Sequence, residues 1–260
     1  MLIYPQLSSG ALAQFPLKRR HRKRTLVNDL PDNTTIKLQD PWSEIIEWQL
    51  VYSGLSDGEA TSLEQFFEAT EGNLAGFTFL DPTANLFACS DDLVNVVWNK
   101  APFLSLTGGV GDPSGGSMGW HLSNSGSGQQ AMSQTLSAPG NYIYTFSLYS
   151  RGSERSVISL RLGARTSSRV LSTEWQRVCL SAAGEADAET TEFGIEVPAG
   201  ASVDLFGFQV EAQPAPSAYK PSQQCGVYEG TTFKDDTLSI IATDVHRYSA
   251  TVNLLYAFSL

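Results

Sequence analysis

Apolar and polar residues alternate along residues 44–52, and this alternation predicts a half-buried β-strand. One side of it is apolar or aromatic and the other is polar: Ile46, Trp48, Leu50 and Tyr52 against Glu47 and Gln49. Shorter apolar or β-branched runs predict two more strands, at 35–38 and 76–80, and the second of these ends at Asp81-Pro82. Residues 1–88 therefore contain a β-rich segment.

One helix is predicted between these strands. Ser56 and Glu59 have the spacing of a capping box, in which each side chain accepts a hydrogen bond from the other residue's free backbone N–H. Leu63, Phe66 and Phe67 then supply an apolar stripe, and Gly72 stands where a helix would stop.

Residues from about 85 to 222 change in texture. Short strand candidates alternate with Gly-, Ser- and Pro-rich turns, which predicts an all-β sandwich of the jelly-roll type. We interpret the Gly/Ser-rich stretch 108–127 as a loop, with Trp120 packed inside it. The strand candidates are 142–148, 157–162, 175–180, 193–197 and 203–210.

The last segment predicts two further strands, 237–243 and 251–258. It is too short to form a domain of its own, so we expect its strands to join the sheet begun near the N-terminus. The predicted fold class is thus mainly β. A split β-rich domain with one short helix (1–88 and 226–260) carries an inserted β-sandwich jelly roll (89–225).

Charge is concentrated in one place. The chain has 17 Lys and Arg against 27 Asp and Glu, and six of the basic residues lie in the heptapeptide 18–24. With a pI near 4.7, nucleic-acid binding is not expected. A solvated basic loop and a contact with an acidic neighbouring subunit or a tube are both open readings. The candidate interface residues are Lys18, Arg19, Arg20, Arg22, Lys23 and Arg24.

Little in the sequence points to catalysis. His21, His121 and His246 are isolated from other catalytic residue types, and no metalloprotease, phosphate-binding or dinucleotide motif is present. Residues 115–119 match G-x-S-x-G but lack the strand and helix that a nucleophile elbow needs. The three cysteines are too scattered for a zinc site or a disulfide framework. We expect no enzymatic activity, no cofactor and no metal site, and apolar runs this short predict no membrane span.

Two stretches resemble known families. The first is Trp48-x-x-x-Tyr52, then Leu55–Glu59, Phe66-Phe67, Gly72 and Phe77–Pro82. It looks like the N-terminal region of distal tail or minor tail proteins of long-tailed bacteriophages. This resemblance implies a β-rich domain that forms a ring, usually six-fold, between the tail tube and the tail tip. It also implies a location in the virion, with tube and hub proteins as partners.

The second stretch covers about residues 85–222. Its landmarks are Asn85–Phe87 with Ser90, Trp175-Gln176-Arg177, Gly207–Glu211 and Ser217–Pro221. They are similar to the framework of jelly-roll modules in phage tail proteins, which resemble carbohydrate-binding domains. Framework residues need not bind ligand, and we interpret Trp98, Trp175 and Tyr219 as core or strand-closing residues. The candidate glycan-binding residues are Trp120, Gln134, Tyr144, Tyr149 and Arg151.

Three functional hypotheses follow. The leading one is a structural tail-tip protein whose jelly roll is presented outward, either to bind a host cell-surface polysaccharide or as decoration. The alternative is a stand-alone carbohydrate-binding, lectin-like module, although residues 1–88 would be superfluous to it. A glycan-degrading enzyme is the least favoured, because sequence alone cannot bring two carboxylates to the required separation.

Overall fold

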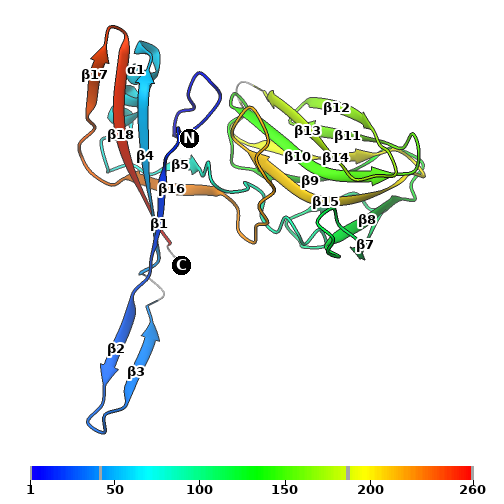
Figure 1. The fold of residues 1–260 in the computed structure, drawn as a ribbon, viewed down its shortest axis with the longest axis horizontal. Helices are drawn as coiled ribbons and strands as arrows, with labels where there is room; N and C mark the ends of the chain where they lie inside the picture. Colours follow the sequence, from blue (N-terminus) through cyan, green and yellow to red (C-terminus); the bar gives the residue numbers. More distant parts are fainter. Residues whose placement is uncertain (1, 41–42, 186–187, 259–260) are drawn as a thin grey trace. The chain divides into compact units, whose positions relative to one another are not determined.

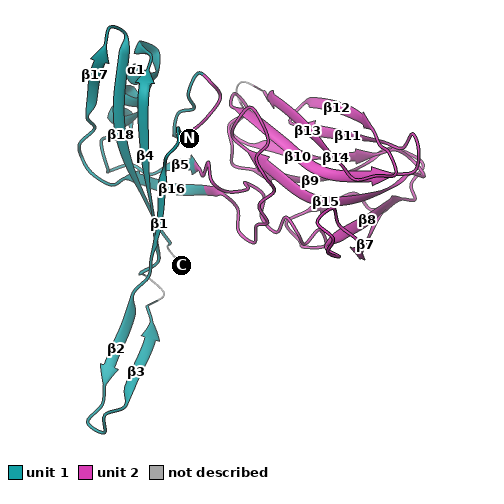
Figure 2. Cartoon of the chain, in the orientation of Figure 1, with its two compact units in different colours: residues 1–8, 13–79, 228–260 teal, residues 9–12, 80–227 magenta. Residues whose placement is uncertain are grey.

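The computed structural model describes residues 2–40, 43–185 and 188–258. They form two compact units, drawn in teal and magenta in Figure 2. The split unit comprises Met1–Ser8, Ala13–Phe79 and Tyr228–Leu260, and the sandwich unit comprises Ser9–Leu12 and Leu80–Val227.

A six-stranded sheet forms the body of the split unit. Its strands run in the order β1 (Lys18–Arg22), β4 (Ile45–Leu55), β18 (Arg247–Ala257), β16 (Val227–Phe233) and β5 (Phe77–Leu80), and β17 (Ile240–Asp244) pairs with β18. The C-terminal strand β18 lies between β4 and β16, so both parts of the sequence build one sheet.

Helix α1 (Asp57–Ala69) begins at the predicted capping box, with Ser56 as N-cap and reciprocal hydrogen bonds to Glu59. Its buried face carries Leu63 and Phe66, and the Phe66 ring meets Phe77 at a centroid distance of 4.9 Å. The helix ends one residue before the predicted stop: Glu71, at φ +50°, holds the left-handed position after the C-cap Thr70, and the Gly72 N–H donates to the Phe67 carbonyl at 3.1 Å. The apolar side of β4 faces this core, and its polar side faces away.

Strands β2 (Thr25–Asp29) and β3 (Thr35–Gln39) form a separate two-stranded ribbon, paired with one another and with no other strand of the described residues (Figure 1). Leu26 lies opposite Leu38, and Asn28 lies opposite Ile36, so these four side chains share one face. All of them are exposed, Leu26 by 46% and Leu38 by 53%. The ribbon thus presents an apolar face to solvent.

The sandwich unit contains two five-stranded antiparallel sheets. The first, the β10 sheet, has the order β13-β10-β15-β8-β7, and the second, the β14 sheet, has the order β12-β11-β14-β9-β6. Mainly β structure with one helix and an inserted sandwich confirms the predicted fold class. The strands are β6 (Asn99–Lys100), β7 (Leu104–Val110), β8 (Gly119–Asn124), β9 (Gln130–Leu136), β10 (Ile143–Gly152), β11 (Val157–Leu162), β12 (Arg165–Val170), β13 (Gln176–Ala183), β14 (Thr191–Val197) and β15 (Ser202–Glu211).

The insertion leaves and re-enters the split unit through neighbouring strands. The chain departs after β5 and returns as β16, and these two strands are hydrogen-bonded to each other. At the start of the insertion, the Asp81 N–H donates to the Gly226 carbonyl at 2.9 Å. Residues 80–88 belong to the sandwich, although the sequence analysis placed them in the first domain. The reason is Phe87, whose ring packs on Phe146 and Phe193 in the sandwich core.

Candidate functional site

The outer face of the β10 sheet carries a row of polar side chains from three adjacent strands. Arg151 on β10 lies directly opposite Asp204 on β15, and Asp204 lies opposite His121 on β8. Side chains alternate along each strand, so neighbours such as Leu205, which is fully buried, point into the core instead. The register of the sheet, and not proximity in sequence, brings these three residues together.

Hydrogen bonds fix the row. His121 Nδ1 lies 2.8 Å from Asp204 Oδ1, and Arg151 Nε donates to Asp204 Oδ2 at 2.9 Å. The side chains remain reachable by solvent, with exposed fractions of 46% for His121, 33% for Arg151 and 20% for Asp204. The Nη groups of Arg151 make no hydrogen bond to any other described residue, so they are free donors beside an oriented carboxylate.

A hollow of about 280 Å³ opens beside this row. Its walls include the end of β10, the start of β15 and Thr173, together with the three residues of the row. Asp204 is the single acid among the lining residues. The two-carboxylate arrangement of a glycosidase is therefore not formed by this lining.

Trp175 extends the row on the β13 side. The Arg151 guanidinium stacks over the indole ring, with its carbon 4.7 Å from the ring centroid. The indole N–H donates to the Gly111 carbonyl at 3.2 Å, which fixes the plane of the ring. A half-buried aromatic ring and a planar cation thus form one stacked pair at the edge of the hollow.

The adjacent part of the same face is covered by the chain itself. Tyr149 lies between the guanidinium of Arg177 and the ring of Phe206, at 5.5 and 6.1 Å. Phe206 in turn packs against Tyr219. Gly207, at φ +68°, leaves room for the Tyr219 ring, which lies only 3.2 Å from where a Cβ would stand. Tyr149 is consequently a packing residue at the border of the open face.

The residues at the C-terminal end of the second resemblance, within 207–211 and 217–221, make structural contacts with one another. The Gln209 carboxamide accepts from the Lys220 backbone N–H at 2.7 Å, and the buried Glu211 accepts from the Ser217 N–H at 2.9 Å. Tyr219 donates its hydroxyl to Asp91. Burial and this carboxylate raise the pKa of Tyr219 above its ordinary value. These residues fasten the segment after β15 across the sheet, so they form the framework.

Three of the predicted glycan-binding residues need correction. Tyr144 is fully buried, and its hydroxyl donates to the Pro139 carbonyl at 2.8 Å. Gln134 is also buried, and its amide donates to the Ala88 carbonyl at 2.8 Å. Trp120 lies opposite the buried Leu205, on the inner side of the sheet, and its indole N–H donates to Asp91 O at 2.9 Å. Of the five residues, Tyr149 and Arg151 lie on the outer face.

Sequence reasoning missed His121, Asp204 and Trp175 as members of the row. Asp204 is separated from its partners by 53 and 83 positions, and no motif links them. The naming of Tyr144 as a glycan-binding residue could have been avoided, because the alternation within β10 indicates which side of the strand is buried. Tyr144 shares its side with Phe146 and Leu148, which marks it as a core residue.

The basic run divides into three structural roles. Arg19 points inward, where its guanidinium lies over Trp48 and donates to the Tyr228 hydroxyl at 2.7 Å. Lys23 pairs with Glu44 at 3.3 Å, and Arg24 pairs with the buried Asp40. The remaining residues, Lys18, Arg20 and Arg22, are exposed on β1.

The G-x-S-x-G match lies in the turn between β7 and β8, and no helix follows it. Asp112 organises this turn by accepting from the N–H groups of Met118, Ser114 and Gly116. These hydrogen bonds, that of Met118 above all, lower the pKa of Asp112. The turn therefore has a structural explanation.

The described residues contain no cluster of three or more metal-ligating side chains. No helix among them has the length and apolarity needed to cross a bilayer.

The chain matches no protein-family model and no curated protein sequence. Similar solved structures include the carbohydrate-binding module TmCBM61 in complex with β-1,4-galactotriose (11% identity, TM-score 0.38, 49% of this chain and 98% of that one). A family 22 carbohydrate-binding module of Clostridium thermocellum Xyn10B is another (13%, 0.40, 51% and 96%). A third is the enzymatically active domain of tailspike protein 4 of bacteriophage CBA120 (15%, 0.38, 51% and 22%). None of these three is a distal tail protein, and at these TM-scores the similarity assigns neither a family nor a ligand.

Proposed function

We propose that the sandwich unit binds carbohydrate, without catalysis, on the outer face of the β10 sheet. The observation that supports this most directly is the row formed by Arg151, Asp204 and His121, with Trp175 stacked at its edge. Planar polar groups held by mutual hydrogen bonds need little reorganisation to bind the adjacent hydroxyls of a sugar. An aromatic platform beside them offers a surface for pyranose C–H groups.

The charge of the row favours a neutral or weakly acidic glycan. Arg151 and Asp204 cancel each other, and His121 adds a positive charge only when protonated. The free Nη donors of Arg151 supply the hydrogen bonds, and the hollow of about 280 Å³ beside them offers room for a sugar. We infer that affinity comes from few contacts and is correspondingly modest.

The test is affinity electrophoresis of the full chain through gels that contain xylan, galactan or polygalacturonate. Retardation by at least one polysaccharide is expected, and Arg151→Ala and Trp175→Ala are expected to reduce it about tenfold or more, the equivalent of ~1.4 kcal/mol. Phe103→Ala is the matched control, because this aromatic ring is 56% exposed but lies outside the row. Equal retardation of all three variants would show that the outer face of the β10 sheet is not the binding surface.

A second candidate function is structural: a tail-tip protein of a bacteriophage that assembles into a ring between tube and tip, located in the virion. The β2–β3 ribbon favours it. A two-stranded hairpin with one apolar face is marginally stable in water by itself, and contact with another subunit would cover Leu26, Ile36 and Leu38.

The mass of the purified protein in solution tests this second function. Light scattering combined with negative-stain microscopy is expected to show a closed ring, either alone or after addition of the tube protein. A monomer under both conditions would reject assembly and leave the carbohydrate-binding proposal standing.

A further inference from the structure

The split unit carries two exposed stripes of opposite charge. We define the basic stripe as Lys18, Arg20 and Arg22 on β1, and the acidic stripe as Glu64 and Glu68 on α1 with Glu71 just beyond it. The chain as a whole has a formal net charge of −10, so the basic stripe is a local exception.

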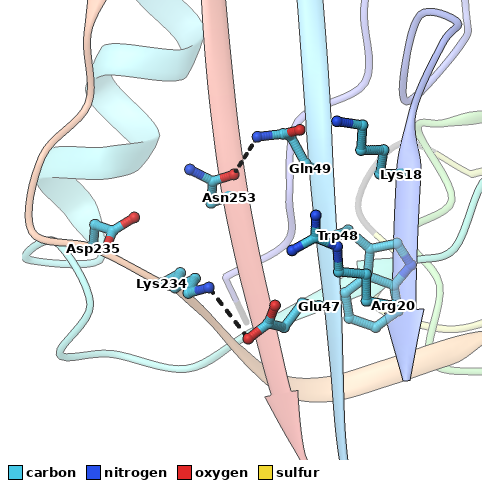
Figure 3. Close-up of a pocket in the computed structure, with 8 residues that line it drawn as sticks. All are labelled: Lys18, Arg20, Glu47, Trp48, Gln49, Lys234, Asp235 and Asn253. Atoms are coloured by element: carbon cyan, nitrogen blue, oxygen red, sulfur yellow. Dashed lines mark hydrogen bonds and ion pairs between the residues drawn. The ribbon is translucent and has the colours of Figure 1, made fainter. Parts of the chain in front are cut away.

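The basic stripe borders a hollow of about 300 Å³ on the outer face of the sheet. Alternate residues of β1 share this face, and Lys18 and Arg20 lie opposite Gln49 and Glu47 of β4. In Figure 3 both basic side chains extend from β1 over β4 toward these two residues. Gln49 donates to Asn253 at 3.3 Å and closes the far side of the hollow.

Lys18, Arg20 and Arg22 form no ion pair with any residue that the structure describes. Glu47 in the hollow is paired with Lys234 at 3.2 Å, and Asp235 is the other acid in the lining. The hollow is thus lined by three cations, Lys18, Arg20 and Lys234, and by two carboxylates. Arg22 adds a further positive charge next to it on β1, so this surface is suited to binding carboxylates.

The acidic stripe is arranged at a cost to the isolated helix. Glu64 and Glu68 are exposed and one turn apart, a like-charge spacing that destabilises a helix. Glu68 also stands in the last turn, which contains no basic residue, although the helix dipole favours cations there. A cationic surface placed against this stripe would relieve both effects.

The two stripes cannot meet within one molecule. Phe66 of α1 packs on Tyr4, and the Tyr4 hydroxyl bonds to that of Tyr52, on the apolar side of β4. Gln49 and Glu47 are on the other side of the same strand. The helix therefore covers one face of the sheet, and the hollow opens on the opposite face.

We propose that copies of this chain associate head to tail, with the acidic stripe of one copy seated against the basic stripe and hollow of the next. A second copy fits better than a polyanion because the chain contains the complementary surface on its opposite face and is acidic elsewhere. A contact between two different patches is heterologous, and it closes into a ring when the rotation between copies permits. The proposal specifies the contact for the second proposed function and is independent of carbohydrate binding.

Charge reversal of the full chain provides the test. One variant combines Glu64→Lys and Glu68→Lys, and the other combines Lys18→Glu and Arg20→Glu. Each alone would bring like charges together, so light scattering is expected to show at least a tenfold weaker association for each. The mixture of the two variants restores opposite charges at every contact, and reassembly is expected. Wild-type association is also expected to weaken with salt, since screening shortens the reach of these charges to about 10 Å at 0.1 M.

Arg155→Glu and Glu154→Lys serve as matched controls, because both residues are exposed in the turn after β10. Circular dichroism establishes that every variant is folded. A monomeric wild type at low salt overturns the proposal. Rings that persist in both reversed variants overturn this contact but leave ring assembly intact. Loss of association without rescue in the mixture overturns the head-to-tail pairing.

Discussion

Replacement of Asn85 by Leu is expected to destabilise the sandwich unit selectively. The Asn85 side chain is buried, and it makes four hydrogen bonds to backbone groups. Its Nδ2 donates to the carbonyls of Phe208 at 2.7 Å and Lys220 at 3.2 Å, and its Oδ1 accepts from Phe87 N and Val210 N, both at 3.1 Å. One amide thus ties the start of the insertion to β15 and to the segment that follows it.

The magnitude follows from these four contacts. Each buried backbone group left without a partner costs about 1–3 kcal/mol, and Leu removes the partner of all four. Burial of the Leu side chain returns roughly 2 kcal/mol. The four losses together come to about 4–12 kcal/mol, so the net loss is about 2–10 kcal/mol, which is comparable with the ~5–15 kcal/mol by which a domain is stable.

Hydrogen exchange read by mass spectrometry measures this loss in each unit separately. Peptides from β10 report on the sandwich and those from β18 on the split unit. Protection in β10 is expected to fall by about thirtyfold or more, at about tenfold per 1.4 kcal/mol, with β18 unchanged. The exposed Asn99→Leu should leave both within about 0.5 kcal/mol. Undiminished β10 protection in Asn85→Leu would refute the reasoning, and equal loss in β18 would refute the independence of the units.

Two further predictions concern the split unit. Burial raises the pKa of Glu59, but hydrogen bonds from Ser56 and Ser8 outweigh it and lower the pKa from 4.5 to about 2. The ionised carboxylate therefore stabilises the fold above about pH 4.5, and this stabilisation is lost as the pH falls toward 2. In an acid titration followed by circular dichroism, Glu59→Gln is expected to reduce the dependence of stability on pH in that range. Arg19→Gln is expected to lower the free energy of unfolding by about 1–3 kcal/mol, because the contacts with Trp48 and Tyr228 are lost. Arg20→Gln is expected to change it by no more than about 0.5 kcal/mol. Equal melting temperatures of the two variants would contradict the division of the basic run.

The elements that the sequence predicted well are those with local causes. Helix α1 begins where its capping box is complete, and β4 follows the alternation of apolar residues. The prediction of a loop over residues 108–127 is wrong at Gly108 and Gly119, because both glycines lie in the strands β7 and β8. A Cβ on Gly108 would stand 3.3 Å from the ring of Trp120, and one on Gly119 would stand 2.8 Å from Val110 O. Close cross-strand packing explains these two glycines, and the turn between the strands accounts for Gly111, Gly115 and Gly116.

The candidate site was less predictable because it depends on strand register. The type of its side chain makes Arg151 a candidate glycan-binding residue in the sequence alone. Its partners Asp204 and His121 become its neighbours only through the pairing of β10, β15 and β8. A shift of one residue in either pairing would turn a member of the row toward the core. No single-sequence pattern determines that register across so many intervening residues.

The position of the insertion explains how one chain could combine the two functions that we propose. Strands β5 and β16 are neighbours in the split sheet, so their connection could have been a short turn, and the sandwich takes its place. An insertion at such a point keeps the register of the host sheet, since its entry and exit are already adjacent. The hydrogen bond from Asp81 to Gly226 closes the insertion at its own base. Variation in the sandwich would therefore alter the proposed carbohydrate binding without disturbing the charged stripes by which we propose the split unit assembles.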